Sequence, residues 1–250
     1  MRDVARMVHF GDQIGPAMKS PLRNVKLYWH RARDTKQIVL DGVRISTDRD
    51  RLPRFVRSAL FKGTYESHER AFVRRLLKPG DRVLEIGAGI GVVSLLAAKI
   101  SGAGNVLSYE ANPRLEDTIR ENYALNGIAP NLRMRAVTLD GQPITFFRSE
   151  NIVSSSTKDR GSHAETLTVQ SDRLDDIVAE HRPNVVIMDV EGAEIDLLSN
   201  ADLSGVRHIV VEVHPHITGD EKIAAMLARL QSIGFSRVDE AHKTIVLGRN

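Results

Sequence analysis

The sequence predicts an α/β fold in which a mostly parallel, doubly wound sheet carries helices on both faces. From Arg82 onward, short apolar runs alternate with segments of helical periodicity, which is typical of parallel strands joined by helices. Glycines or acids follow several of these runs, where strand gives way to helix. The last two predicted strands are joined too tightly for a crossover, so one of them is expected to be antiparallel.

The elements of residues 79–250 come in a regular order. Strands are expected over Arg82–Ile86, Val106–Tyr109, Leu132–Val137, Val185–Met188, His208–Val213, Phe235–Val238 and Thr244–Leu247. Helices are expected over Gly91–Ile100, Pro113–Asn126, Ser171–His181, Ala193–Leu198 and Asp220–Ile233, with Ser171 as a possible N-cap. The alternating segments Ile144–Phe147 and Thr166–Val169 indicate a hairpin or meander.

Residues 1–78 are expected to form an N-terminal extension and not an independent domain. They contain a predicted strand pair over Gln37–Ser46, turned at Asp41-Gly42, and helices over Pro53–Phe61 and Ser67–Leu77. We expect this extension to cover the ligand edge of the sheet formed by residues 79–250.

Composition narrows the possible functions. The chain has 250 residues, no Cys and a net charge of +3. The lack of Cys excludes disulfides, thiolate zinc sites, iron–sulfur clusters and Cys nucleophiles. No apolar run approaches the roughly 18 residues that span a bilayer, and the first 20 residues do not resemble a signal peptide, so we expect a cytoplasmic protein with no membrane partner. Basic residues gather in the N-terminal quarter, where a solvated helical face explains them, and no nucleic-acid partner is expected.

The strongest motif is the apolar strand that runs into the glycine turn Gly87-Ala88-Gly89-Ile90-Gly91. Glycine permits a tight turn and lets a ligand approach the backbone closely. Glu110 ends the next predicted strand, 110 − 91 = 19 residues past the last glycine. At that spacing a carboxylate can accept hydrogen bonds from both ribose hydroxyls of an adenosine cofactor.

The residue after the last glycine helps to indicate the type of adenosine cofactor. A dinucleotide fingerprint requires Gly or Ala where this chain has Val92, which argues against a pyrophosphate under the helix. The chain also has no P-loop sequence. The pattern Glu-x-Gly-x-Gly-x-Gly instead resembles motif I of class I S-adenosylmethionine-dependent methyltransferases.

A second acidic motif comes after the strand Val185–Met188. Asp189, Glu191 and Glu194 lie within six residues, around Gly192. The carboxyl end of a parallel strand faces the ligand crevice, so Asp189 is expected there. The helix dipole favours first-turn acids, which explains Glu194 and is an alternative explanation of Glu191.

The sequence Asp-Val-Glu-Gly-Ala-Glu after an apolar strand resembles the hallmark of FkbM-type methyltransferases. Two departures from that family pattern are Met188, where Lys is frequent, and Gly89, where Asn is frequent. Other stretches resemble the family from about Val39 onward: Gly63-Thr64-Tyr65-Glu66, Leu77-Lys78-Pro79-Gly80-Asp81, Tyr109-Glu110-Ala111-Asn112-Pro113, Ala136-Val137, Ser154-Ser155-Ser156, Leu174-Asp175-Asp176 and Glu212-Val213-His214.

The resemblance implies a Rossmann-like, seven-stranded sheet with a C-terminal antiparallel strand. It implies methyl transfer from S-adenosylmethionine, most often to a hydroxyl of a sugar or natural-product small molecule. In the implied cofactor site Gly87, Ala88 and Gly89 lie beneath the methionine moiety, and Glu85 holds its ammonium. Glu110 accepts the ribose hydroxyls, Ala111 and Asn112 flank the adenine, and Ala136 and Val137 form the wall on its other side. Glu66 closes the pocket, and Asp189 lies nearest the methyl group.

Three residues are candidates for catalysis: Asp189, His214 and Glu191. Asp189 is the candidate closest to the expected methyl group, while the pKa near 6.5 of an ordinary His suits His214 as a base. Asp189, Glu191 and His214 together could also hold a divalent metal that orients a substrate diol, an alternative that we do not favour.

Other function classes stay open at this point. An NAD(P)-dependent oxidoreductase is the enzyme alternative, and a catalytically inactive cofactor-binding scaffold is the non-enzyme alternative. Methylation of protein or RNA is a further possibility within the same class. The acceptor and the oligomeric state are not readable from the sequence, because acceptor specificity resides in loops and extensions.

Overall fold

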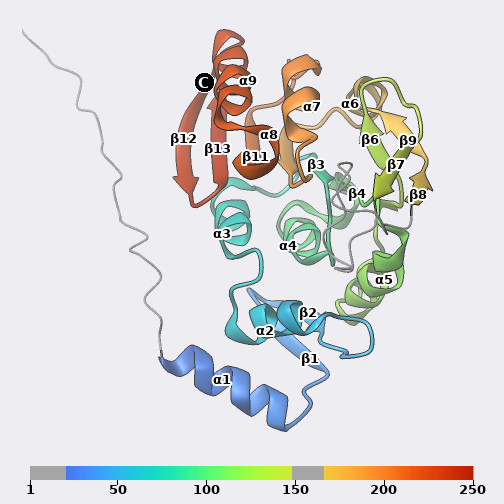
Figure 1. Ribbon diagram of the computed structural model, residues 1–250, viewed down its shortest axis with the longest axis vertical. Coiled ribbons are helices and arrows are strands. Elements are labelled where there is room, and N and C mark those ends of the chain that lie inside the picture. Colours follow the sequence, from blue (N-terminus) through green and yellow to red (C-terminus); the bar gives the residue numbers. More distant parts are fainter. Residues whose placement is uncertain (1–20, 148–165, 250) are drawn as a thin grey trace, which may run out of the picture.

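A computed structural model describes residues 21–147 and 166–249 (Figure 1). Its central sheet has seven strands in the order β12-β13-β11-β10-β3-β4-β5. Every neighbouring pair is parallel except those of β13, which is antiparallel to both neighbours. This confirms the predicted fold class. The strands are β3 (Val83–Ile86), β4 (Val106–Tyr109), β5 (Leu132–Arg133), β10 (Val185–Met188), β11 (His208–Glu212), β12 (Phe235–Ala241) and β13 (Thr244–Arg249).

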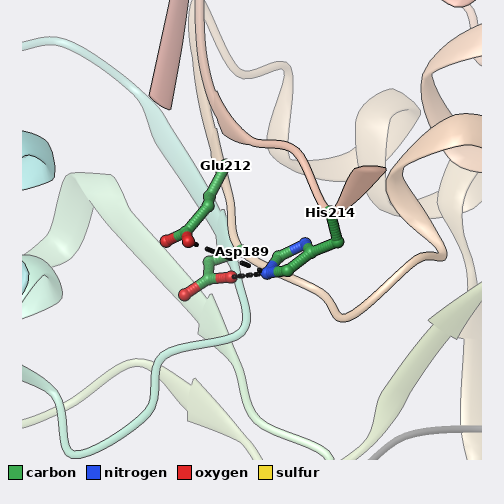
Figure 2. Close-up of side chains that lie close together, drawn as sticks. All are labelled: Asp189, Glu212 and His214. Atoms are coloured by element: carbon green, nitrogen blue, oxygen red, sulfur yellow. Dashed lines mark ion pairs between the residues drawn. The ribbon is translucent and has the colours of Figure 1, made fainter. Parts of the chain in front are cut away.

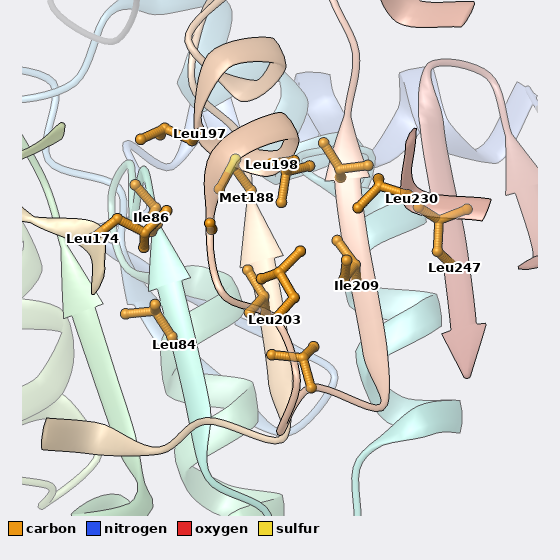
Figure 3. Close-up of a cluster of buried hydrophobic side chains, with 14 of the residues drawn as sticks. Leu84, Ile86, Leu174, Met188, Leu197, Leu198, Leu203, Ile209, Leu230 and Leu247 are labelled. Atoms are coloured by element: carbon orange, nitrogen blue, oxygen red, sulfur yellow. The ribbon is translucent and has the colours of Figure 1, made fainter. Parts of the chain in front are cut away.

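Helices cover both faces of the sheet. On one face α3 (Ser67–Leu76), α4 (Val92–Ser101) and α5 (Glu116–Leu125) surround an apolar core, and on the other α6 (Leu174–His181), α7 (Glu194–Asn200) and α9 (Asp220–Ser232) bury the cluster drawn in Figure 3. Short helical turns complete the connections: η1 (Ala103–Asn105), η2 (Pro113–Leu115) and α8 (Pro215–Thr218). Among the described residues, no helix is long and apolar enough to cross a membrane.

The region before the sheet packs into the same core. It contains α1 (Pro21–Ala32), β1 (Gln37–Leu40), β2 (Val43–Ser46) and α2 (Arg54–Lys62), and the predicted antiparallel strand pair is confirmed. Asn122 of α5 fixes this region to the sheet: its side chain accepts from the Ser46 amide at 2.7 Å and donates to the Ile90 carbonyl at 2.8 Å. The division of the chain at residue 78 stays a prediction.

Two predicted elements are wrong. The strand over Leu132–Val137 is broken: β5 ends at Arg133, and β6 (Ala136–Thr138) pairs with β9 (Ser171–Arg173) in a separate small sheet. After Arg133 the backbone pairs with a different partner: the Ala136 amide donates to the Gln170 carbonyl at 2.9 Å, and the Arg135 guanidinium binds Asp172 beside it. The helix over Ser171–His181 begins at Leu174, so Ser171 is no N-cap but a strand residue that donates to the Gln142 carbonyl. The hairpin of β7 (Ile144–Phe147) and β8 (Thr166–Val169) is confirmed.

The ligand edge lies where β3 and β10 meet. The chain builds outward from β3 through β4 and β5 and then returns to β10 on the other side, and ligands of such sheets bind at this switch point. The two strands are in register, Val83 opposite Val185 and Ile86 opposite Met188. The turn after β3 and the acidic segment after β10 are therefore neighbours.

Gly87 allows this close approach. It has a φ of +89°, and a Cβ at this position would lie 1.9 Å from the backbone oxygen of Asp189. Real side-chain atoms do not approach backbone this closely, so any other residue would push the two segments apart.

The contact predicts a large cost for Gly87→Ala. Gly80 has a similar φ of +85° but open space around it, which makes Gly80→Ala a matched control. We expect Gly80→Ala to cost about 1–2 kcal/mol for its backbone conformation alone, and Gly87→Ala to cost at least about 2 kcal/mol more or to prevent folding. Urea unfolding measures both. Equal losses would show that the approach of Gly87 to Asp189 is not tight.

Candidate active site

One pocket opens at the carboxyl edge of the sheet, over the switch point. It encloses about 970 Å³, including space open to solvent. The walls come from the turns after β3, β4 and β10, from β6 and β7, and from the segment before α3. The lining residues are Tyr65, Glu66, Ile86, Gly87, Gly89, Tyr109, Glu110, Ala111, Asn112, Arg135, Ala136, Val137, Ile144, Asp189, Val190, Glu191, Ala193 and Leu197.

The structure brings most of the predicted site residues to this pocket. Those that line it are Glu66, Gly87, Gly89, Glu110, Ala111, Asn112, Ala136, Val137, Asp189 and Glu191. Glu85, Ala88 and His214 are not among its lining residues. His214 nevertheless contacts the pocket through Asp189, whereas Glu85 and Ala88 lie behind the turn.

The amides of the glycine turn have partners within the protein. Those of Gly87 and Ala88 both donate to the Tyr109 carbonyl, at 2.9 and 3.0 Å. The Gly89 amide donates to the Glu110 carboxylate at 2.8 Å. A dinucleotide site needs such amides for a pyrophosphate, so this turn is poorly suited to one.

Glu110 ends β4 as a buried carboxylate directed into the pocket. One oxygen accepts from the Gly89 amide and the other from the Asn112 amide, both at 2.8 Å. Burial raises the pKa of Glu110 to about 7, although the amide hydrogen bonds favour its charged form. Each oxygen keeps a second lone pair. The carboxylate can therefore accept two further hydrogen bonds from a vicinal diol.

Glu85 points to the other side of the strand. In β3, Leu84 and Ile86 face the core below α6 and α7, so the alternation turns Glu85 toward α4. It is 2% exposed. Burial raises its pKa to about 7, against the influence of Ser108 and Ser94. The predicted contact of Glu85 with a bound ammonium is not direct in this structure.

The N-terminal region contributes Tyr65 and Glu66 from the turn before α3. Glu66 has a left-handed backbone, φ 45°, and its Oε2 is buried without a hydrogen-bond partner among the described residues. Burial and the charges of Glu69, Asp189 and Glu85 raise the pKa of Glu66 well above its ordinary value. A strained backbone with an unsatisfied buried acid marks a binding position more often than a structural one.

Asp189 lies beside two residues, Glu212 and His214, that are distant from it in the sequence. The His214 Nε2 is 3.7 Å from Asp189 Oδ1 and 3.8 Å from Glu212 Oε1 (Figure 2). Burial and the charge of Glu212 raise the pKa of Asp189. Burial opposes the charged form of His214, but Glu194, Asp189 and Glu212 together raise its pKa. Glu191 lines the same pocket without joining this cluster.

Several residues of the site were not among the predicted ones. Tyr65 lies inside the motif Gly63-Thr64-Tyr65-Glu66, and Arg135 directly precedes Ala136 of another recognised motif. Glu212 lies inside a motif that resembles the family. Ile144 and Leu197 carry no chemical signal, because apolar wall residues look like any core residue.

The sheet topology, the glycine turn after β3 and the buried acid that ends β4 agree with the predicted class I methyltransferase fold. The sequence model of the methyltransferase FkbM domain matches residues 85–237, more than half of the chain. The chain therefore belongs to the methyltransferase FkbM family.

Individual relatives are more distant. The hexuronic acid methyltransferase AglP of Haloferax volcanii is 30% identical over 154 residues, which are 58% of this chain and 62% of that protein. A ribosomal protein L11 methyltransferase of Caldicellulosiruptor saccharolyticus is 26% identical over 151 residues, 55% of this chain and 48% of that protein. The chain thus spans between about half and two thirds of the length of these relatives.

Among solved structures, magnesium protoporphyrin IX methyltransferase (ChlM) from Synechocystis PCC 6803 was crystallised with bound S-adenosylmethionine. It aligns with a TM-score of 0.47 at 14% identity and covers 79% of this chain and 85% of its own. We draw no functional conclusion from this distant likeness.

The burial of Glu85 predicts a stability that depends on pH. Its folded pKa of about 7 exceeds the unfolded value near 4.5, so the folded state holds the proton more tightly and its stability falls as pH rises from 4.5 to 7. Glu85→Gln removes this loss, about 3 kcal/mol by linkage. The free energy of unfolding of the variant, relative to that of the wild type, should therefore increase as pH rises from 4.5 to 7.

Urea unfolding between pH 4.5 and 8 measures the difference. Glu221→Gln, on the exposed face of α9, is the control and should follow the wild-type curve. If Glu85→Gln also follows it, Glu85 is not a buried acid with a raised pKa.

Proposed function

We propose that the protein methylates a hydroxyl oxygen of a small molecule, most simply of a sugar. The observation that carries this proposal is the pairing of Asp189 with His214 at the rim of the pocket, 3.7 Å apart. A hydroxyl keeps its proton at neutral pH and must lose it during attack, so it requires such an acceptor. The similarity to a hexuronic acid methyltransferase supports a sugar as the methyl acceptor.

The residues present fit S-adenosylmethionine. We propose that Glu110 accepts the ribose hydroxyls with the lone pairs left over from its two amide contacts. Ala111 and Asn112 would flank the adenine on one side, and Ala136 and Val137 on the other. The cofactor supplies a methyl group bound to a positively charged sulfur.

For the ammonium of the cofactor we propose Glu66 and not Glu85. Glu66 lines the pocket and has a buried oxygen without a partner among the described residues, whereas Glu85 lies behind the turn. At Gly89 a Cβ would lie 3.2 Å from both Glu66 Oε1 and the Tyr65 hydroxyl, so the turn, Tyr65 and Glu66 form one narrow wall. We expect this wall to hold the amino-acid end of the cofactor and to exclude water.

For the proton of the acceptor we propose Asp189. An ordinary aspartate is a weak base, but burial and the charge of Glu212 raise the pKa of this one. His214 would stabilise the group through its Nε2, and Glu191 would bind the acceptor at the rim. During transfer the acceptor forms the new O–C bond as the S–C bond breaks and sulfur keeps the electron pair, and Asp189 takes the hydroxyl proton.

Methylation of a protein amine is the second candidate, because L11 methyltransferases also resemble the chain. An amine accepts a methyl group without a base once it is neutral, so Asp189 and His214 would have no necessary role in that reaction. The oxidoreductase alternative is disfavoured, since the turn amides that would face a pyrophosphate donate within the protein.

Two nucleosides separate the roles of Glu66 and Glu110. S-adenosylhomocysteine carries the ammonium, and 5′-methylthioadenosine lacks the amino-acid end altogether. Glu66→Gln should weaken the affinity for S-adenosylhomocysteine about tenfold, the order of one charge-assisted hydrogen bond. It should change the affinity for 5′-methylthioadenosine by less than about twofold. Glu110→Gln should weaken both alike. Calorimetric titration of the wild type and both variants gives the six affinities. Equal effects of Glu66→Gln on the two nucleosides would show that Glu66 does not bind the ammonium.

Methyl transfer from radiolabelled S-adenosylmethionine tests the acceptor class. A panel of sugars and uronic acids is compared with amines and with purified L11. We expect label on a hydroxyl acceptor, with a loss of about 100-fold or more in kcat for Asp189→Asn, since general-base catalysis contributes about 10²–10⁴-fold. Label on amines alone would contradict O-methylation.

A further inference from the structure

Three side chains converge beside the pocket, from the ends of the neighbouring strands β10 and β11. Asp189 follows β10, Glu212 ends β11, and His214 lies two residues further on (Figure 2). Each offers one atom that can bind a metal, and these three atoms all lie within 4.8 Å of one another. Two carboxylate oxygens and one imidazole nitrogen form a donor set common in metal sites.

The spacing differs from that of a hydrogen-bonded cluster. The His214 Nε2 is 3.7 Å from Asp189 Oδ1 and 3.8 Å from Glu212 Oε1, beyond the range of hydrogen bonds. Both carboxylate oxygens lie within ion-pair distance of this nitrogen, and the His214 side chain is only 6% exposed. Ligand atoms of one divalent cation, with bonds of about 2.0–2.3 Å, lie roughly 3–4 Å apart.

The other ring nitrogen is oriented by a buried acid. His214 Nδ1 lies 3.4 Å from Glu194 Oε1, and the Glu194 side chain is fully buried. That carboxylate is itself held by the Gly192 amide at 2.7 Å and the His214 amide at 3.1 Å. The contact between Nδ1 and Glu194 is at ion-pair distance and is not a formed hydrogen bond. The negative charge beside Nδ1 still favours the tautomer with its proton there, which leaves the Nε2 lone pair directed into the cluster. Metal-binding histidines have this second contact in most known sites.

The charge balance also favours a cation. Within the part of the chain that the structure describes, His214 is the only basic side chain within ion-pair distance of Asp189 or Glu212. Two half-buried carboxylates that share a single imidazole leave negative charge in excess, which a divalent cation would offset.

We infer that Asp189, Glu212 and His214 bind one divalent transition-metal ion of the Mn²⁺ type at the rim of the pocket. The two carboxylates suit Mn²⁺ as they do Mg²⁺, and the imidazole makes a transition-metal ion a better match than Mg²⁺, which prefers oxygen ligands. Glu191, which the sequence offered as a ligand, is replaced by Glu212.

The role of the ion rests on the proposed function. Asp189 binds the ion through Oδ1 and also lines the pocket, so an acceptor hydroxyl can coordinate the ion next to it. The ion lowers the pKa of that hydroxyl. The hydroxyl proton would leave to solvent as the O–C bond forms and the S–C bond breaks, with the electron pair left on sulfur.

Electron paramagnetic resonance of Mn²⁺ tests the inference on the full chain after treatment with a chelator. We expect one saturable site per chain, because bound Mn²⁺ loses its six-line signal. Glu212→Gln and His214→Ala should each weaken it at least tenfold. The matched controls are Glu191→Gln, in the same pocket, and His216→Ala, an exposed neighbour whose ring centroid lies 5.9 Å from that of His214. Both controls should bind Mn²⁺ like the wild type.

Pulsed measurements on the wild type alone give a second test that needs no variant to fold. Nitrogen modulation from one imidazole is expected in the Mn²⁺ complex, and its absence, or the lack of saturable binding, overturns the inference. Equal losses in the control variants also overturn it. S-adenosylhomocysteine is titrated in parallel without metal. If the protein binds this nucleoside but has no Mn²⁺ site, only the inferred metal site is refuted. If it has a Mn²⁺ site but does not bind the nucleoside, only the proposed function is refuted.

Discussion

The site depends on the close approach of two chain segments at the point where the sheet reverses direction. Parallel pairing of β3 with β10 brings the glycine turn against the acidic segment, and the Asp189 amide donates to the Ile86 carbonyl at 3.0 Å. The backbone of Gly87 then lies where a Cβ would overlap Asp189. Because both segments are fixed by strand register, the pocket floor and the candidate base keep a set separation without any ligand.

Around this floor the protein concentrates buried carboxylates. Glu66, Glu85, Glu110 and Asp189 all have raised pKa values, in each case because burial disfavours the charged form. Arg135 lines the pocket too, but its guanidinium is bound to Asp172. Such an arrangement costs stability in the empty protein. It matches a cofactor with a positive sulfur and an ammonium, whose charges offset those of the acids.

The sequence predicted the parts of the site that lie at strand ends. Gly87, Glu110 and Asp189 each come directly after an apolar run, so their place at the sheet edge follows from the topology alone. The place of Glu85 could not be predicted in the same way. Strand alternation shows that its side chain lies on the opposite face of the sheet from Leu84 and Ile86, but it does not show which of the two faces holds the ligand. The joining of Glu212 to Asp189 depends on the pairing of β11 with β10, which no local pattern reveals.

Calorimetric titration of the ligand-free protein with S-adenosylhomocysteine, and separately with NAD⁺, tests the central claim most directly. The account predicts saturable binding of S-adenosylhomocysteine at one site per chain, in the micromolar range that is about −8 kcal/mol, and no heat of binding with NAD⁺. Binding of NAD⁺ alone, or of neither compound, would contradict the claim that this acidic pocket is built for a methyl donor.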